Sequence, residues 1–141
     1  MTHYLLDTNI CIYLINKKPG PLISRLKRVI KSGVGLSSIT LSELEFGVQK
    51  SQRPQKNAVN LVRFLLPFEI LSFDEKAAEA YGIIRADLEK QGRVIGNMDM
   101  LIAAHAKSLN TTLVTNNEKE FCRIPYLRVE NWTRSSQTRK E

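Results

Sequence analysis

Short apolar segments alternate with longer amphipathic segments along almost the whole chain of 141 residues. The short segments have the length of buried β-strands, and the longer ones place apolar residues at helical spacing, as in residues 21–31. Two parallel strands need a crossover of a dozen or more residues, and a helix usually supplies it. The alternation therefore predicts an α/β fold with a mostly parallel central sheet.

The chain length fits one domain, which we expect over residues 1–133, followed by a frayed polar tail over residues 134–141. Five segments carry the apolar and β-branched residues of strands: residues 4–7, 34–38, 69–73, 112–115 and 127–132. Helical spacing and capping residues predict seven helices: residues 10–15, 21–31, 40–49, 54–66, 75–91, 98–109 and 117–122. No internal repeat interrupts this order.

The net charge of +7 lies entirely in the first half of the chain. Residues 1–63 carry ten Lys or Arg against three acidic residues, whereas residues 64–141 carry eleven of each. A one-sided basic surface attracts polyanions such as nucleic acids, although a charge of this size also serves solubility. The charge permits a nucleic-acid partner and does not by itself indicate a nuclease.

The cysteines and the apolar segments favour a cytoplasmic protein without a membrane anchor. Cys11 and Cys122 are the only cysteines, which are too few for a disulfide scaffold and lack the spacing of metal ligands. No apolar stretch approaches the roughly 20 residues that cross a bilayer. Residues 4–15 are interrupted by Asp7 and Asn9, so they do not form a signal sequence.

Acidic and amide side chains occur where the expected strands end. Asp7 ends the first strand, Glu43 lies in the first helical turn after the second strand, and Asp99 lies in the first turn of the sixth expected helix. Asn117 and Glu120 follow the fourth strand. Functional sites of open α/β sheets gather beyond the carboxyl ends of the strands. Four carboxylates can therefore converge on one edge of the sheet.

Converging carboxylates point to a metal site. Carboxylates without partners repel one another and resist ionisation, and a divalent cation removes this penalty. Mg²⁺ and Mn²⁺ take oxygen ligands, and such a site can activate water for attack on a phosphodiester. The sequence offers no Cys/His metal cluster, no Gly-rich phosphate loop and no Ser-His-acid set. The carboxylates are therefore the groups that we expect to carry the catalytic chemistry of this chain.

Three of these acids also have purely structural interpretations. Asp7 can cap the helix that follows it, although its two neighbours can cap as well. Glu43 and Thr40 have the spacing of a capping box, whereas Gly47 on the same helix face leaves room for a partner. Asp99 can complement the helix dipole, but its side of the helix is rich in small residues that favour close packing.

The other polar and aromatic candidates favour structural roles. Glu120, like Glu118, can be an ordinary solvent-facing acid. His105 lies six residues after Asp99, on a different helix face, which favours a structural histidine over a ligand. We expect the larger aromatic residues in the core rather than stacked on nucleic-acid bases: Tyr4, Tyr13, Phe46, Phe64, Phe68 and Trp132.

Four short motifs follow one another along the chain: residues 5–9 (LLDTN), 42–47 (SELEFG), 92–106 (GRVIGNMDMLIAAHA) and 113–121 (LVTNNEKEF). In sequence and order they resemble the motifs of PIN-domain nucleases, particularly bacterial VapC toxins. Each motif is weak alone, whereas all four together, with the long third match, are specific. The chain thus resembles this family over nearly its whole length.

The resemblance implies a three-layer α/β/α fold and an endoribonuclease that depends on Mg²⁺, with Mn²⁺ able to substitute. It implies that Asp7, Glu43 and Asp99 form the acidic core of the site. The implied substrates are structured RNAs, often tRNA anticodon loops, with the initiator tRNA favoured. The implied assembly is a homodimeric toxin that pairs with a VapB-type antitoxin, as a heterotetramer or larger complex.

One position departs from the family pattern. Many PIN domains carry Asp where this chain has Asn117. An amide can still bind a metal through its oxygen, but it brings no negative charge. Glu120 matches the acid of the family's fourth motif and can supply the missing carboxylate. Arg93 can hold an RNA phosphate or be an ordinary loop residue.

Two other functions remain open on the sequence. Asn117 leaves room for a non-catalytic RNA-binding module of the same fold. A phosphotransfer domain is also conceivable, but a dehalogenase-type phosphatase needs Asp-x-Asp after the first strand, and the third position here is Asn9. A receiver domain needs an acceptor Asp on a central strand, and the sequence does not provide one.

Overall fold

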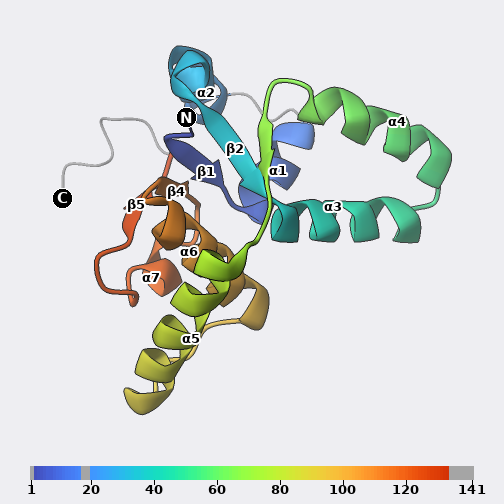
Figure 1. Cartoon of the computed structure of the whole chain (residues 1–141). Coiled ribbons are helices and arrows are strands. Elements are labelled where there is room, and N and C mark those ends of the chain that lie inside the picture. The colour runs from blue at the N-terminus through green and yellow to red at the C-terminus, as the bar shows by residue number, and fades with distance from the viewer. Residues whose placement is uncertain (1, 17–19, 134–141) are drawn as a thin grey trace.

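The centre of the molecule is a parallel β-sheet of five strands in the order β3-β2-β1-β4-β5 (Figure 1). The structure is a computed structural model that describes residues 2–16 and 20–133. The strands are β1 (Tyr4–Leu6), β2 (Val34–Ser37), β3 (Glu69–Leu71), β4 (Thr112–Val114) and β5 (Arg128–Glu130). The predicted parallel sheet is confirmed. The expected tail over residues 134–141 lies outside the described residues.

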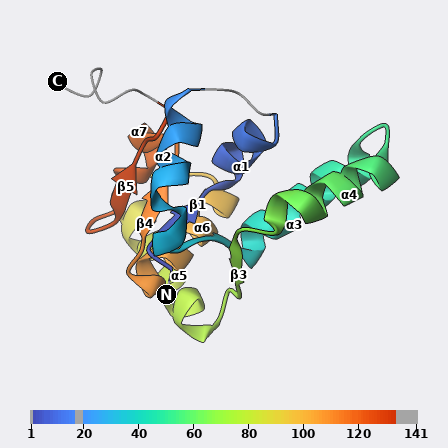
Figure 2. The same ribbon diagram turned by 90° about the horizontal axis from the view of Figure 1, so that it is seen from above.

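Helices cover both faces of the sheet. They are α1 (Thr8–Ile15), α2 (Pro21–Val29), α3 (Ser38–Lys50), α4 (Pro54–Leu65), α5 (Glu75–Lys90), α6 (Asn97–Leu109) and α7 (Glu118–Phe121), with a 3₁₀ turn at Ile30–Ser32. The α3–α4 hairpin projects away from the sheet (Figure 2). Among the described residues, no helix has the length and apolar character to cross a membrane.

The alternation of side chains along the central strands creates two cores. Successive residues of a strand point to opposite faces of the sheet. Leu5 and Leu113 join the apolar cluster formed with α5, α6 and α7. Leu6 and Val114 join the cluster formed with α1, α2, α3 and α4. The expected three-layer α/β/α arrangement is thereby confirmed.

The strand register brings three chain segments to the same sheet edge. Leu6 pairs with Val114, and the backbone N–H of Asp7 donates to the Val114 carbonyl at 3.0 Å. On the other side, Leu5 pairs with Gly35, where a Cβ atom would stand 2.8 Å from the Glu69 carbonyl oxygen. Glycine thus permits close pairing of β2 with β3. The residues after β1, β2 and β4 consequently meet at one edge.

Each expected strand and helix is present, but several ends differ. The expectation that Glu43 belongs to a capping box with Thr40 is wrong, because α3 begins at Ser38 and is capped by Ser37. Glu43 therefore lies in the second turn rather than the first. α1 likewise begins at Thr8, directly after its cap Asp7. Both helices begin where the preceding strand ends, so no linker separates the sheet from the residues beyond it.

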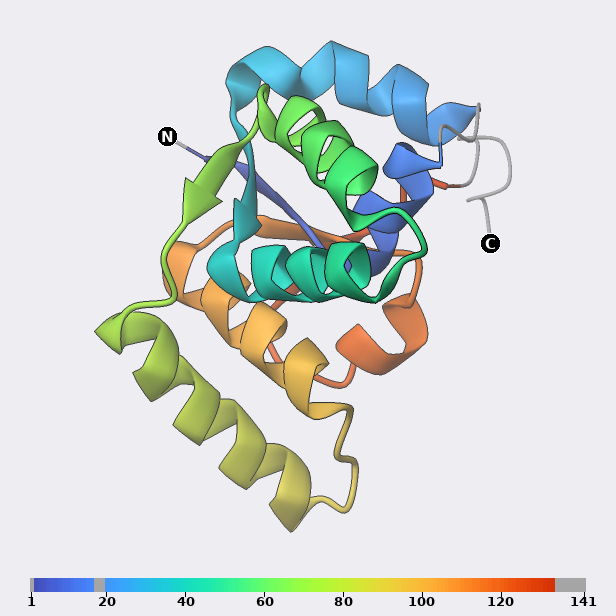
Figure 3. The same cartoon turned by 90° about the vertical axis from the view of Figure 1, so that its right-hand side faces the viewer.

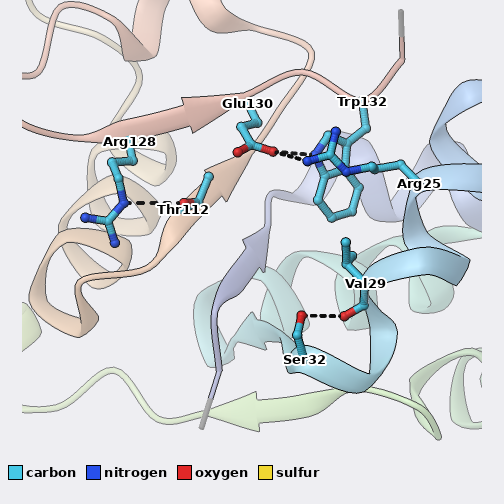
Figure 4. A network of polar contacts seen from close by, with 7 residues as sticks. All are labelled: Arg25, Val29, Ser32, Thr112, Arg128, Glu130 and Trp132. Atoms are coloured by element: carbon cyan, nitrogen blue, oxygen red, sulfur yellow. Dashed lines mark hydrogen bonds and ion pairs between the residues drawn. The ribbon is translucent and has the colours of Figure 1, made fainter. Parts of the chain in front are cut away.

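A polar network fastens α2 to the last strand (Figure 4). Glu130 accepts hydrogen bonds from the Trp132 indole at 2.9 Å and from Arg25 at 3.2 Å. The Arg25 guanidinium also lies 5.4 Å from the centre of the Trp132 ring, which meets Tyr4 edge-on at 5.2 Å. The indole thus contacts α2 and β1 together and closes one end of the core.

Candidate active site

Asp7 lies at the end of β1 and is only 3% exposed. Its Oδ1 atom accepts the Ile10 N–H at 2.9 Å, so it caps α1, and the Thr115 hydroxyl donates a second hydrogen bond to its carboxylate. Burial nevertheless raises its pKa from 3.8 to about 6, helped by the negative charges of Asp99 and Glu43. The capping role expected as an alternative is real, and the same carboxylate also faces two other acids.

Glu43 reaches the sheet edge from the second turn of α3. Its carboxylate accepts a hydrogen bond from the Thr8 hydroxyl, which also lies 3.2 Å from the Thr40 hydroxyl. Thr8 is the residue after Asp7, so this bond ties α3 to the end of β1. Thr40, expected to be a cap, instead supports this contact from the buried side of α3.

Asp99 approaches the same place from the first turn of α6 and is half-buried. Its pKa is raised first by burial and then by the negative charges of Glu120 and Glu43. The negative charge of Asp99 in turn helps to raise the pKa of Asp7. The structure thus brings Asp7, Glu43 and Asp99 into electrostatic contact, as the sequence predicted.

Asn117 and Glu120 form the fourth side of this arrangement. The Asn117 amide donates to Glu120 Oε1 at 3.1 Å, and its backbone N–H donates to the Thr115 hydroxyl at 2.9 Å. Thr115 therefore connects Asn117 to Asp7. Glu120 acts on Asp99 through its charge. These two residues surround the acids without lining the cleft described next.

An open cleft of about 560 Å³ lies over the three carboxylates. Asp7, Glu43 and Asp99 line it with the polar residues Thr8, Asn9 and Ser42. Its remaining walls are Ile12, Phe46, Gly47, Lys50 and Met98, which come from α1, α3 and α6. A more apolar groove of about 280 Å³ continues between α1, α3 and α4. The carboxylates are therefore reachable from solvent.

The donor set of the cleft suits a hard divalent cation. As the side chains stand, no three His, Cys, Asp or Glu residues within 2–16 and 20–133 are close enough together to hold one ion. The oxygens are nonetheless those that Mg²⁺ and Mn²⁺ prefer, and two of the three acids carry pKa values raised partly by the other acids. A cation bound among these acids would relieve that repulsion.

His105 has the structural role that the sequence predicts. It is fully buried, and its Nδ1 atom lies 2.7 Å from the Ser37 hydroxyl, while its ring meets Phe73 edge-on. Burial lowers its pKa, partly opposed by the charge of Asp74. Ser37 also accepts the Ile39 N–H at 3.0 Å as the cap of α3. The histidine thus joins α6, which carries Asp99, to α3, which carries Glu43.

One expected core residue is in fact exposed. Phe46 is 64% exposed and lines the cleft, so its assignment to the core is wrong. The spacing of buried residues on α3 could have shown this, because Leu44 and Val48 mark the buried face and Phe46 lies between them on the other side. The other expected core aromatics do pack in the core: Tyr4, Tyr13, Phe64, Phe68 and Trp132.

Sequence reasoning also missed the partners of the acids and one cation. Thr8 and Thr115 hold Glu43 and Asp7, and Lys50 lies in the cleft with its Nζ atom 5.2 Å from the centre of the Phe46 ring. Such supporting hydroxyls have no motif of their own in a single sequence. Arg93 is exposed outside the cleft, and its contact with RNA stays a prediction.

Comparison with known proteins decides the family. Residues 4–126, most of the chain, match the PIN domain family model. The chain belongs to the PIN-domain family. Within it, this PIN domain is of the VapC type, because it is 49% identical over 130 residues to Ribonuclease VapC2 of Rickettsia felis, covering 92% of this chain and 97% of that protein.

Two further relatives support the same placement of this PIN domain. The tRNA(fMet)-specific endonuclease VapC of Shigella flexneri is 41% identical over 133 residues, covering 94% of this chain and all of that protein. The solved structure of VapBC2 from Rickettsia felis bound to a promoter DNA fragment matches with a TM-score of 0.88 at 48% identity, covering 93% of this chain and 99% of that chain. The predicted family is confirmed, and it argues against the phosphotransfer alternative.

Proposed function

We propose that this PIN domain is the toxin of a VapBC toxin–antitoxin pair and cleaves RNA at the cleft over Asp7, Glu43 and Asp99. One observation carries the proposal: three acids from β1, α3 and α6 line one open cleft in a chain that belongs to the VapC type. A buried acid with a raised pKa in such a cleft is typical of a catalytic or metal-binding group.

The proposed site holds Mg²⁺, with Mn²⁺ as a substitute. Asp7 and Asp99 would be the main ligands, and Glu43 would complete the acidic core. Asn117, which does not line the cleft, would offer only its amide oxygen, because its nitrogen donates to Glu120. The ion, when bound, lowers the pKa of a bound water and neutralises charge that develops on the phosphate. The side chains of this chain perform the remaining tasks.

Each side chain has a distinct proposed task. Asp7 accepts hydrogen bonds from the Ile10 N–H and the Thr115 hydroxyl, which fix the orientation of its carboxylate at the site. Thr8 orients Glu43 in the same way. Glu120 is proposed as a positioning residue that acts through its charge on Asp99. Attack by water on phosphorus breaks the bond to the 3′ oxygen and leaves a 5′-phosphate and a 3′-hydroxyl.

The substrate and partner are proposed from the relatives. The Shigella flexneri protein is named as tRNA(fMet)-specific, so we propose tRNA(fMet), cut in its anticodon loop, as the first RNA to test. The Rickettsia felis structure is a VapBC complex, so we propose a VapB-type antitoxin as the partner of a homodimer of this chain. A reducing cytoplasm remains our prediction for its location.

Inducible expression tests the toxin function. Expression of the wild type should stop growth and produce discrete tRNA fragments in total RNA, whereas Asp7→Asn and Asp99→Asn should do neither at equal protein levels. Co-expression of a VapB-type antitoxin that binds this chain should restore growth. Equal growth and intact RNA in wild-type and Asp7→Asn cultures would reject the proposal.

A further inference from the structure

We propose that Phe46 is a stacking platform for an unpaired base of the RNA, and that Lys50 contacts the phosphate next to that base. The inference rests on the proposed ribonuclease function and adds a binding position to the same cleft. It concerns Phe46 and Lys50, which have no task in the reaction proposed for the three acids. Both residues line the cleft that contains Asp7, Glu43 and Asp99.

The exposure of Phe46 is the first observation. Phe46 is 64% exposed on a helix whose buried apolar residues are Leu44 and Val48. Phe46 is absent from both apolar clusters of the core, so its ring does not support the fold by packing in either. Single exposed apolar residues are common, but Phe46 also lines the cleft that contains the acids, where an aromatic ring can contact a ligand with its flat face.

The order of residues along α3 is the second observation. Glu43, Phe46, Gly47 and Lys50 follow one another at helical spacing and all face the cleft. A Cβ atom at Gly47 would meet no atom within 4 Å beyond its two chain neighbours and the backbone of its own helix, so open space lies over Gly47, the residue next to Phe46. Lys50 stands roughly 10 Å along the helix axis from Glu43 at 1.5 Å per residue. A nucleotide therefore has room between the acids and the lysine.

The charge of the cleft is the third observation. Lys50 is the one cationic side chain among the described residues that line it, opposite three carboxylates. Its ammonium lies 5.2 Å from the Phe46 ring centre, and no ion pair to an acid holds it within the described ranges 2–16 and 20–133. It can therefore leave the ring for a phosphate when a base takes its place.

These features select an unpaired nucleotide. Every base has a flat face that can stack on an aromatic ring, but a paired base in a helix is already stacked and cannot reach it. Phenylalanine has no polar atom, so it favours unpaired over paired RNA without choosing a base by hydrogen bonding. Met98, which is 44% exposed, lines the same cleft from α6 and offers a second apolar contact.

A cycle of protein and RNA changes tests the platform. The probe is a tRNA(fMet) anticodon stem-loop oligonucleotide in which each loop nucleotide is made abasic in turn. Binding is measured on Asp7→Asn protein, so that cleavage does not interfere, and KM and kcat are measured on protein with Asp7 intact. We expect one abasic position to weaken binding by about 5- to 100-fold and to raise KM. In Phe46→Ala protein the same abasic position should change binding less than about twofold.

Matched variants separate stacking from general effects. Phe46→Trp should restore the sensitivity to the abasic position, and Ile83→Ala, which removes another strongly exposed apolar side chain from α5, should leave it unchanged. Lys50→Gln should weaken RNA binding and make it less dependent on salt concentration, and Lys50→Arg should restore both the affinity and the salt dependence. The platform would be overturned if, at every loop position, removing the base weakened binding equally with and without Phe46→Ala while the protein still cleaved RNA. Failure of the wild type to bind or cleave RNA would instead overturn the ribonuclease function, and the platform with it.

Discussion

The buried Asp7 carboxylate makes the metal-free protein sensitive to pH. Its pKa is raised from 3.8 to about 6, so the folded state holds its proton more tightly than the unfolded state does. Protonated Asp7 therefore makes its full contribution to the stability of the folded state below about pH 4, and this contribution is lost as the pH rises to about 6. At neutral pH the charged carboxylate therefore destabilises the metal-free fold by roughly 3 kcal/mol.

Asp7→Asn should relieve this destabilisation. The amide oxygen can still accept the Ile10 N–H, but the side chain no longer ionises. We expect the variant to be about 1–3 kcal/mol more stable than wild type at pH 7 in EDTA and to lose the difference at pH 4. Urea unfolding followed by circular dichroism at several pH values measures this. A variant less stable than wild type at pH 7 would contradict the assigned burial cost.

Glu120 should influence the reaction through Asp99. Removing its charge in Glu120→Gln lowers the pKa of Asp99, so the acidic limb of the pH–rate profile should move to lower pH. We expect at most about a tenfold loss of kcat, against about 100-fold or more for Asp99→Asn. A pH–rate profile of Glu120→Gln identical to that of wild type would show that the two carboxylates do not interact.

Single residues at strand ends were predictable, and their partners were not. Asp7 and Asp99 follow directly from the strand and helix boundaries in the sequence. Phe46 was misplaced because an aromatic residue in an apolar segment is usually buried, although its phase on the helix disagreed with its neighbours. Thr8 and Thr115 are common residues whose hydroxyls acquire a role only in the folded sheet. Thr8 needs β1 beside β2, which leads into α3 and Glu43, and Thr115 needs β1 beside β4.

Helix α3 carries much of the cleft, and its start depends on one hydroxyl. Ser37, Ser38 and Thr40 can all cap a helix, so the sequence alone permits more than one start for α3. The structure selects Ser37, whose hydroxyl lies at the end of β2 and also contacts buried His105. Tertiary contact thus decided between capping signals of similar strength, and a single sequence does not reveal such contacts.

Ser37→Ala should therefore lower the free energy of unfolding by more than the loss of an ordinary helix cap does. It removes the bond to the Ile39 N–H and leaves His105 Nδ1 without its partner in the core. We expect a loss of about 2–4 kcal/mol in the free energy of unfolding. The control is Ser42→Ala on the same helix, where the hydroxyl bonds only to a carbonyl in its own turn and a change within about 0.5 kcal/mol is expected.

Gly47 should show a conflict between stability and activity. Alanine fits there without contact, and it removes the entropic cost of glycine in a helix, so Gly47→Ala should stabilise the fold by about 0.5–1 kcal/mol. The added methyl group narrows the cleft beside Phe46, so RNA cleavage should fall. A stabilised variant with wild-type KM and kcat would show that RNA does not approach α3 at this point.

The basic half of the chain folds into one region of the molecule. Helices α2, α3 and α4 lie on the same side and share one apolar cluster (Figure 3). Arg25 is used in the network with Glu130, whereas Lys27, Arg28, Arg53 and Lys56 are exposed. Exposed cationic side chains on α2 and α4 are suited to hold RNA by its phosphates.

Neutralising part of this surface should weaken RNA binding without moving the cut. For Arg53→Gln with Lys56→Gln, we expect weaker binding to all RNAs and a shallower dependence of log Kd on log salt, by about one for each lost phosphate contact. The cleavage position should not change, because the substitutions lie outside the cleft. An altered cut site would mean that α4 selects the target.

The fold class was predictable because strand and helix periodicities alternate, and a parallel sheet follows from that alternation. Periodicity alone does not determine the strand order, since crossovers of similar length permit several orders. That order matters for the site: β1 lies between β2 and β4, so the residues after all three meet. The central claim is that Asp7 and Glu43, which follow β1 and β2, form one metal-dependent ribonuclease site with Asp99 of α6.

Cleavage of tRNA(fMet) by purified protein tests that claim most directly. Wild type and Asp7→Asn are incubated with the RNA in Mg²⁺, in excess EDTA, and in EDTA followed by added Mg²⁺. We predict that wild type cuts in Mg²⁺, stops in EDTA and resumes after Mg²⁺ is restored, while Asp7→Asn stays at least about 100-fold slower and remains folded. Full wild-type cleavage in excess EDTA, or undiminished cleavage by Asp7→Asn, would contradict the account.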